Sequence, residues 1–413
     1  MVKQLHVVFF LIIILLCSCH IAKSIINEKI INQCNYDYND EIIFITLGTS
    51  FSPKIIVEGD AEILWIWDDE TTSHSDHPEK NYGSTDVRIN RLKVVPWSAL
   101  SRINIGYTGE DGGDYNVHLH KDIEQIQYVE NQHVYSVQNL ELAAPYLKQW
   151  CSSYNPIYEL DFSNFVKLDT IECFNSTSLE EIKLDNTPSL RRLCVEHCKL
   201  SRLDLSQSPG LEDLRFARQA IQGEVSLNFG STGQKIWHIC IHTNRLNEQT
   251  LFDGSKQYPN LVDLYLHKAN QTGDLIISQT GDKQDVVISV NSNNYRSADF
   301  RGALQNRKRP GRVVINDNIL ENINLQGCIQ LTKLEVNNNN LSNLDISDCP
   351  ALVFLSAENN RLSSDEVTDI LKTLDDFELT EGSISLTGNA KPSEIGMQYV
   401  DHLIQKGWIV RTD

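Results

Sequence analysis

The chain is poor in basic residues. It has 36 lysines and arginines against 55 aspartates and glutamates in 413 residues, a formal net charge of -19. The pI is near 5.0, and no long basic run interrupts the acidic excess. Nucleic acids and anionic lipid surfaces attract proteins through clustered lysine and arginine. The charge balance therefore argues against a nucleic-acid-binding protein and against membrane contact through bulk electrostatics.

The motifs of common enzyme classes are also missing. The sequence contains no Gly-x-Ser-x-Gly, no phosphate-cradling glycine-rich loop and no His-Glu-x-x-His. Cys240 lies close to His238 and His242, which suggests a nucleophile and base pair. However, neighbours on one strand diverge outward, and a flat sheet offers no oxyanion donors. We therefore expect no enzymatic activity and no cofactor.

The N-terminus contains an apolar run, residues 7–16, which follows Lys3 and is too short to span a bilayer comfortably. Residues 1–24 are therefore predicted to be a signal peptide. Residues 16–19, Leu-Cys-Ser-Cys, resemble the bacterial lipobox, which implies lipidation of Cys19 and an outer-membrane lipoprotein. The alternative is ordinary cleavage after Ser24 and a secreted protein. A single-pass membrane anchor is a third reading, although no stop-transfer pattern follows.

One sequence frame organises the second part of the chain. Residues 331–341 read Leu-x-x-Leu-x-Val-x-x-Asn-x-Leu, and the frame returns 21 residues later over residues 352–362 with Ala in place of Val. Apolar residues at alternate positions place one face of a short strand in a core. The asparagine amide can satisfy backbone groups freed at the following turn. One coil cannot bury its own apolar face, so each coil needs neighbours on both sides.

The frame recurs along the chain from residue 147, and we number each coil by its fourth, inward position. These positions are Trp150, Ile171, Leu193, Leu214, Ile239, Leu264, Ile288, Val313, Leu334, Leu355 and Ile384. Successive positions are 21 to 29 residues apart. The recurrence predicts a solenoid over residues 126–390, including a bridging segment at its start, with residues 391–413 as a C-terminal cap.

This frame resembles that of leucine-rich-repeat proteins, in which each coil adds one strand to a curved parallel sheet. The chain is similar to bacterial surface leucine-rich-repeat proteins of Gram-negative anaerobes and, more loosely, to the internalin-like repeats. The resemblance covers residues 147–413. It implies a concave sheet that binds another macromolecule, but it names no partner, because this family shares a scaffold and not a ligand.

The length of each coil predicts its return path to the next strand. Coils of 21 residues carry a second apolar frame, as in residues 200–211 and 341–352, which requires an extended return. Longer coils have room for a helical turn, and residues 246–252 and 364–371 both begin with a capping residue and show helical apolar spacing. Residues 392–406 read as an amphipathic helix before a final strand.

Residues 25–125 show no repeat frame and predict a small antiparallel sandwich. Strands are expected at residues 41–45, 54–57, 63–67 and 88–95. The run Trp-Ile-Trp-Asp-Asp-Glu-Thr-Thr-Ser over residues 65–73, with Pro78 and Tyr82 following, is similar to the signature of PKD-type domains, which implies an immunoglobulin-like sandwich.

Two turn glycines of that signature are replaced here, by Asp68 and Glu70, so we expect a different local turn. The three carboxylates of residues 68–70 form either a calcium site or a solvated acidic turn.

The third, fifth and seventh positions of each coil are expected to point from the sheet into solvent. The central coils concentrate chemically distinctive side chains at these positions, on neighbouring strands about 4.8 Å apart. The predicted partner-binding residues are Arg215, His238, Cys240, His242, Asp263, Tyr265 and His267. Histidine and tyrosine suit a surface that contacts a protein or glycan. The alternatives are a zinc site and a row of ordinary polar positions.

The sequence therefore predicts an exported, non-catalytic surface protein that recognises a protein or glycan through its concave sheet. The alternative is a structural or assembly component of the cell envelope with no diffusible ligand. Eight cysteines follow the N-terminal segment. Cys198, Cys328 and Cys349 occupy ninth positions of apolar frames and Cys173 an inward position, so few or no disulfides are expected.

Overall fold

In the computed structural model, the described residues are 40–47, 49–84, 86–105, 134–144, 146–230, 233–242, 245–247, 251–253, 258–281, 285–301, 303–304 and 309–413. The predicted signal peptide and Cys19 lie outside them. The chain divides into two compact units, one up to Ala143 together with Asn155–Ile157, the other formed by Ala144–Tyr154 and Tyr158–Asp413. None of the described helices is long and apolar enough to cross a membrane.

The first unit is antiparallel. One sheet has the strand order β5 (Thr72–Ser73), β4 (Glu62–Ile66), β7 (Val87–Val95), β1 (Ile42–Leu47) and β9 (Val134–Gln138). Two further pairs are β3 (Lys54–Val57) with β8 (Leu100–Asn104), and β2 (Ser50–Phe51) with β6 (Lys80–Asn81). Two 3-10 helices, η1 (Trp97–Ala99) and η3 (Leu140–Ala143), complete the unit. The four strands predicted from the sequence are all present.

The turn after β4 corrects one expectation. Glu70 replaces a glycine of the signature, yet it adopts the left-handed conformation with φ of 62°. The neighbouring carboxylates are bound within the protein: Asp68 Oδ1 accepts from the backbone N–H of Ile89 at 2.9 Å, and Asp69 pairs with Lys80 at 2.6 Å. These contacts hold the left-handed turn without a glycine.

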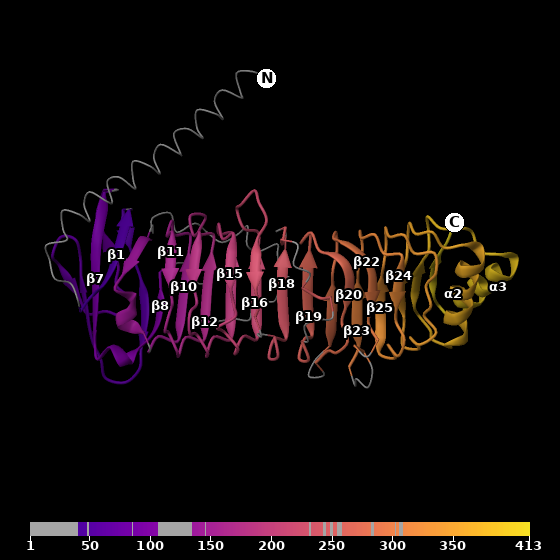
Figure 1. The fold of residues 1–413 in the computed structure, drawn as a ribbon, viewed down its shortest axis with the longest axis horizontal. Helices are drawn as coiled ribbons and strands as arrows, with labels where there is room; N and C mark the ends of the chain where they lie inside the picture. Colours follow the sequence, from indigo (N-terminus) through magenta and orange to yellow (C-terminus); the bar gives the residue numbers. More distant parts are fainter. Residues whose placement is uncertain are drawn as a thin grey trace, which may run out of the picture. The chain divides into compact units, whose positions relative to one another are not determined.

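The second unit is a solenoid whose main sheet is parallel from β10 to β28 (Figure 1). Its strands are β10 (Gln149–Ser153), β12 (Thr170–Phe174), β14 (Arg192–Glu196), β16 (Asp213–Ala217), β18 (His238–His242), β19 (Asp263–His267), β21 (Val286–Ser289), β23 (Gly311–Val314), β25 (Leu331–Glu335), β26 (Phe354–Ser356), β27 (Ser383–Ser385) and β28 (Ile409–Arg411). This mainly β solenoid confirms the predicted fold class.

The eleven fourth positions predicted from the sequence stand opposite one another in register along this sheet. Trp150 pairs with Ile171, and the series continues coil by coil to Leu355 and Ile384. Each of these side chains is at most 1% exposed. Stacking of neighbouring coils therefore buries the apolar surface that a single coil would expose. This burial stabilises the fold by about 25 cal/mol per Å² of apolar surface.

A ladder of ninth-position asparagines joins the later coils. Its members are Asn293, Asn318, Asn339, Asn360 and Asn389. In Asn339, Nδ2 donates to the carbonyls of Ile315 at 2.8 Å and Val336 at 3.1 Å, while Oδ1 accepts from the N–H of Leu320 at 3.0 Å. Each asparagine thus satisfies buried backbone groups of two coils, as the frame predicts.

The return paths confirm one prediction and correct another. Extended strands form in the coils of 21 and 22 residues: β11 (Glu159–Asp161), β13 (Glu181–Lys183), β15 (Arg202–Asp204) and β24 (Asn322–Asn324). The coils of 24 and 25 residues that hold β17 (Ser226–Asn228), β20 (Thr272–Ile276) and β22 (Asn294–Asp299) also return through strands. The expectation of helical turns is therefore wrong for these longer coils: pairing between neighbouring returns satisfies their backbone groups instead. Part of the predicted helical turn at residues 246–252 lies outside the described residues.

Two helices form near the C-terminus, where the sequence predicts them. In α2 (Ser364–Asp376), the Ser363 side chain caps the helix by accepting from the N–H of Glu366 at 3.2 Å. In α3 (Glu394–Gln405), Ser393 caps in the same way, accepting from the N–H of Gly396 at 3.2 Å. After α3, Gly407 takes a φ of 85°, which allows the chain to turn into β28.

Candidate functional site

We use the term sheet face for the side of the main sheet formed by the third, fifth and seventh positions of the coils. The predicted site residues lie together on this face, on β16, β18 and β19. His238 stands opposite Asp263, Cys240 opposite Tyr265, and His242 opposite His267. Arg215 stands opposite Cys240 on the other side. The structure therefore brings all seven predicted residues onto three consecutive strands.

Five rings of this region form a connected series, which we call the ring cluster. Ring centroids are 5.5 Å apart for Trp237 and His238, and 6.0 Å apart for His238 and Tyr265. The series continues from Tyr265 to His267 at 6.3 Å and from His267 to His242 at 5.4 Å. Such rings combine apolar area with polar tips, and they are common at the centre of interfaces.

A network of charged groups borders the ring cluster. Asp213 accepts from the guanidiniums of Arg192 at 3.1 Å and Arg215 at 3.2 Å. Arg192 also lies 3.9 Å from a carboxylate oxygen of Glu172. The Asp213 side chain is only 4% exposed. Buried ion pairs add little net stability, so this network serves to fix positions on the face rather than to strengthen the fold.

Not all of these residues reach solvent as expected. His238 is 1% exposed and Cys240 is 5% exposed, so the expectation that they project freely into solvent is wrong. Strands about 4.8 Å apart place larger side chains on both sides of each residue, and Arg215 and Tyr265 flank Cys240 in register. His242, Asp263, Tyr265 and His267 are half-buried, as is Arg215.

Burial also sets the acidity of the face. Burial raises the pKa of the Cys240 thiol to about 12 and that of the Tyr265 phenol to about 12. Both groups therefore keep their protons at neutral pH. Since the thiolate is the nucleophile, Cys240 lacks the activation that a catalytic cysteine needs. The seven cysteines of the described part are all buried, and none is assigned to a disulfide.

The geometry gives no support to a metal site in the described part of the chain. No group of three or more His, Cys, Asp or Glu side chains there is placed to hold an ion. On the sheet face, His238 Nδ1 lies 3.7 Å from Asp263 Oδ2. In the acidic turn, Asp69 pairs with Lys80 at 2.6 Å and Glu70 pairs with Arg91 at 2.9 Å, so both carboxylates already have basic partners.

Three residues of this region, Arg192, Asp213 and Trp237, were not among the predicted site residues. The ion pair of Asp213 with Arg192 depends on which strands are neighbours, and the predicted site did not use that order. Trp237 directly precedes β18, and its ring centroid lies 5.5 Å from that of His238. The sequence signal for Arg192 and Asp213 was present in their third-position register, 21 residues apart.

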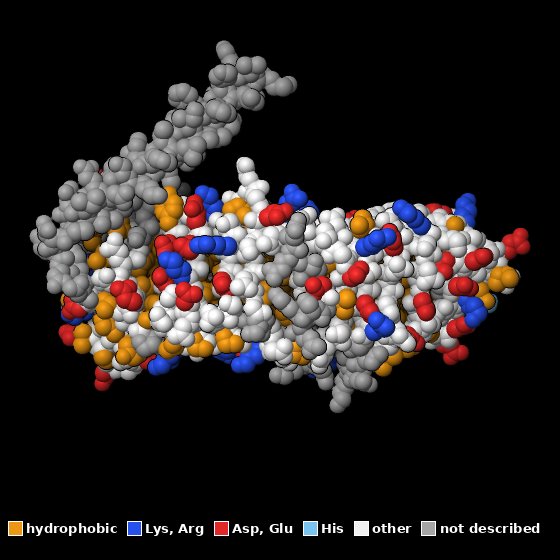
Figure 2. Space-filling view, viewed as in Figure 1, with side chains coloured by type: hydrophobic (Ala, Val, Ile, Leu, Met, Phe, Trp, Pro, Cys, Tyr) orange, Lys and Arg blue, Asp and Glu red, His pale blue; other side chains and the backbone are white. Residues whose placement is uncertain are grey.

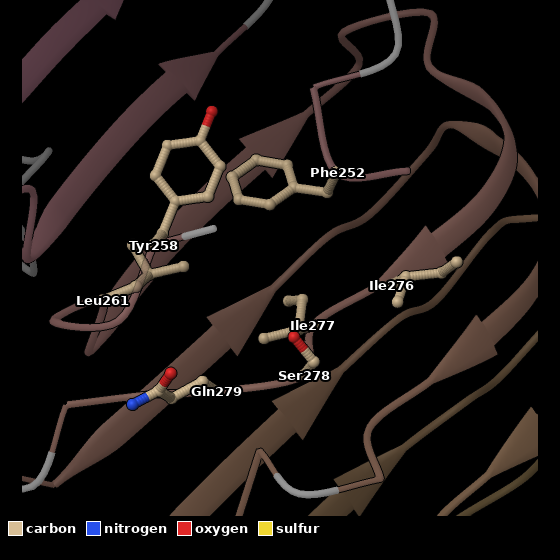
Figure 3. Close-up of a pocket in the computed structure, with 7 residues that line it drawn as sticks. All are labelled: Phe252, Tyr258, Leu261, Ile276, Ile277, Ser278 and Gln279. Carbon is tan, nitrogen blue, oxygen red and sulfur yellow. The ribbon is translucent and has the colours of Figure 1, made fainter. Parts of the chain in front are cut away.

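Neither of two pockets in the described part of the chain includes a residue of the ring cluster. One has a volume of about 420 Å³ and is lined by Lys148, Gln149, Lys167, Asp169, Ser189 and Arg191. A pocket behind the sheet, with the rings of Phe252 and Tyr258 side by side (Figure 3), has a volume of about 10 Å³, room for about one water molecule. In the view of Figure 2, acidic and basic side chains of the described residues are interspersed across the surface. An open sheet face suits contact with a macromolecule better than enclosure of a small substrate.

Parallel strands in register, inward leucines and the asparagine ladder define the class: the second unit is a leucine-rich-repeat solenoid. No family model matches the chain, and no curated protein matches it. Among solved structures, the functional domain of InlJ from Listeria monocytogenes, described as including a cysteine ladder, aligns at 16% identity over 62% of this chain and 73% of that domain, with a TM-score of 0.22. At that score the alignment carries no functional argument.

Proposed function

We propose that the chain is a non-catalytic binding protein that recognises a macromolecule, a protein or a glycan, through the sheet face from β12 to β19. The observation that carries this proposal is the ring cluster beside the Arg192–Asp213–Arg215 network, whose carboxylate is buried. Trp, Tyr and Arg are the residues that most often dominate binding energy. Here Tyr265, Arg192 and Arg215 lie on the sheet face, and Trp237 borders it directly before β18.

The proposed location is the cell envelope or surface. The apolar run of residues 7–16 supports export, and the lipobox-like residues before Cys19 support an outer-membrane lipoprotein, with cleavage after Ser24 giving a secreted form instead. The sandwich-like first unit, with its resemblance to PKD-type domains, would then act as a spacer. The proposed binding function at the cell envelope requires neither nucleic acid nor a cofactor.

Photo-crosslinking tests the binding face directly. A benzophenone amino acid replaces Tyr265 in one variant and Phe354, an aromatic residue of the same face on β26, in the control. We expect Tyr265→benzophenone to crosslink a specific partner on cells of the native source and the Phe354 variant to crosslink none. Equal crosslinking at both positions contradicts the proposal. Loss of envelope localisation without any crosslink supports a structural or assembly component instead.

A further inference from the structure

A polar pocket lies apart from the ring cluster, at the edge of the main sheet where β10, β12 and β14 begin. We call it the corner pocket. Its volume is about 420 Å³, and its lining residues are Lys148, Gln149, Lys167, Asp169, Ser189 and Arg191. All six belong to the second unit. Lys148, Asp169 and Arg191 each directly precede one of the three strands, so the stacking of coils brings them side by side.

Hydrogen bonds hold this edge of the pocket in place. The N–H of Asp169 donates to the carbonyl of Lys148 at 2.8 Å, and the N–H of Arg191 donates to the carbonyl of Asp169 at 2.9 Å. The Asp169 carboxylate accepts from Nε of Arg191 and, at 2.9 Å, from the Thr170 hydroxyl. Asp169 therefore positions the Arg191 guanidinium and is itself already bonded.

The corner pocket offers a ligand more hydrogen-bond donors than acceptors. In the part of the chain that the structure describes, no carboxylate pairs with the Lys167 ammonium, which lies 5.6 Å from the centroid of the Tyr146 ring. Within the same part, the Gln149 amide and the Ser189 hydroxyl make no side-chain hydrogen bond, and Arg191 bonds only through Nε. An ammonium and a guanidinium donate and never accept. The complement of this lining is a ligand rich in oxygen acceptors.

The charge of the corner pocket favours an anion. Three basic groups against one carboxylate leave a charge of +2 on its lining. The charge of Glu212, at the start of the next coil, also acts on Arg191 and lowers this local excess to +1. The whole chain carries -19. A small anionic group is therefore attracted locally, whereas the acidic remainder of the chain repels an extended polyanion.

The size and lining of the corner pocket indicate a ligand larger than an inorganic ion. Its volume far exceeds the roughly 30 Å³ that one water molecule occupies in the liquid, and it falls within the range of small-ligand pockets. All six described lining side chains are polar or charged, so none is an aromatic or aliphatic anchor of the kind found at protein–protein contacts. The methylene stems of lysine and arginine can cover the C–H faces of a sugar ring while their charged tips contact its anionic group.

We propose that the corner pocket binds an acidic sugar unit, a hydroxylated ring that carries a carboxylate or a sulfate group. Lys167 and Arg191 contact the anionic group, because charge-assisted hydrogen bonds are the stronger ones. Gln149 and Ser189 donate to ring hydroxyls. This pocket shares no residue with the ring cluster or with the Arg192–Asp213–Arg215 network, so the inference does not rest on the proposed function.

Titration calorimetry of the full chain tests the ligand class. The probes are digalacturonate, a sulfated galactose and the uncharged sugar lactose, at neutral pH and low ionic strength, where charges are screened least. We expect at least one acidic sugar to bind with a Kd about tenfold lower than that of lactose. The tighter of the two acidic sugars identifies the anionic group as a carboxylate or a sulfate.

Two variants and a matched control test the location. Lys167→Gln keeps most of the side-chain length but removes the charge, and we expect it to raise the Kd of the acidic sugar about tenfold. Ser189→Ala, at an exposed position, should raise this Kd about threefold by removing one neutral donor. Lys333, on β25, also lies over a ring, 4.5 Å from the Phe354 centroid. Lys333→Gln should leave the Kd unchanged.

Each contrary outcome overturns a stated part of the inference. Failure of both acidic sugars to bind, or lactose binding as tightly as they do, overturns the requirement for an anionic sugar. Inorganic sulfate binding as tightly as both sugars overturns the sugar class in favour of a free anion. Tighter binding of an end-capped diglutamate peptide overturns it in favour of an acidic protein segment. Equal losses in Lys167→Gln and Lys333→Gln overturn the pocket in favour of diffuse electrostatics. None of these outcomes alters the crosslinking expected at position 265, so this inference and the proposed function fail separately.

Discussion

The two halves of the sheet face share one backbone register but present different chemistry. From β12 to β19 the face carries the ring cluster and a carboxylate, Asp213, buried between two guanidiniums. From β23 to β27 it carries one ring, Phe354, next to the Lys333–Glu335 ion pair of 2.6 Å, and polar groups that bond to one another. The Ser356 hydroxyl donates to Asn337 at 2.8 Å, and the Ser385 hydroxyl donates to Glu358 at 2.5 Å. The second half thus pairs its polar groups within itself, while the first half concentrates rings and a buried carboxylate.

The corner that follows each face strand shows the same contrast. The eighth position requires a left-handed backbone, and in the second half Asn338 and Asn359 supply it with φ of 55° and 53°. In the first half Asn175 supplies it after β12 with φ of 51°, but His197 and Arg218 occupy the next two corners with φ of 53° each. Asparagine tolerates this region better than histidine or arginine. The corners at His197 and Arg218 are therefore more strained than the asparagine corners of the second half.

The largest predicted effect is at the ninth position. Asn339→Ala removes three donated bonds and one accepted bond from buried backbone groups, so we expect a loss of about 3 kcal/mol of unfolding free energy. At the matching position of the first half, the Cys198 thiol makes contacts of 3.5 and 3.6 Å to carbonyls. Cys198→Ala should cost only about 1 kcal/mol. Urea unfolding measures the free energy of unfolding of both variants. Equal losses in Asn339→Ala and Cys198→Ala would contradict the predicted difference between the two halves.

The second effect concerns the ion network. Asp213→Ala removes the carboxylate that pairs with Arg215, whose side chain is 12% exposed. We expect a loss of about 2 kcal/mol, because truncating one partner leaves the other charge uncompensated. Ser356→Ala, on the self-satisfied half, should cost less than about 1 kcal/mol. Thermal unfolding at pH 7 compares the stability losses of the two variants. A larger loss for Ser356→Ala than for Asp213→Ala would contradict the prediction.

The third effect is a loss of stability in alkali that both halves share. Burial raises the pKa of Cys240 and of Cys328 to about 12 from an ordinary value of 9.0. At pH 10 the unfolded chain therefore loses the proton that the folded thiol keeps. The stability is complete below pH 9 and falls as the pH rises toward 12, by about 1.4 kcal/mol per thiol at pH 10.

Cys240→Ala and Cys328→Ala should each remove that share of the alkaline loss, measured by urea unfolding at pH 8 and pH 10. A loss confined to one half would show that something other than burial sets the thiol acidity.

The smallest effect is at the eighth position. Arg218→Asn should raise the unfolding free energy by about 0.5 kcal/mol, because asparagine adopts the left-handed backbone more readily. The reverse change, Asn338→Arg, should lower it by about 1 kcal/mol, since it also removes the 2.7 Å bond to Asp317. Denaturant midpoints of the two variants test the signs, and a destabilising Arg218→Asn would mean that the pairing with His197 outweighs the strain.

The site was predictable in part. Alternation along β18 and β19 placed six of the predicted residues on one face, since successive side chains point to opposite sides of a strand. The burial of His238 was not predictable, because it depends on the ring of Trp237 and on Tyr265, which belongs to the next coil. The return strands of the longer coils were missed because their hydrogen bonds join segments more than 20 residues apart.

The amino-acid sequence alone determined the solenoid, because the recurrence of inward residues at near-constant spacing leaves stacking as the only way to bury them. It also determined which side chains share the sheet face. Only the tertiary structure decided which of them stay accessible and which are paired. That outcome depends on the side chains of adjacent coils, whose mutual distances follow from strand packing rather than from position along the chain.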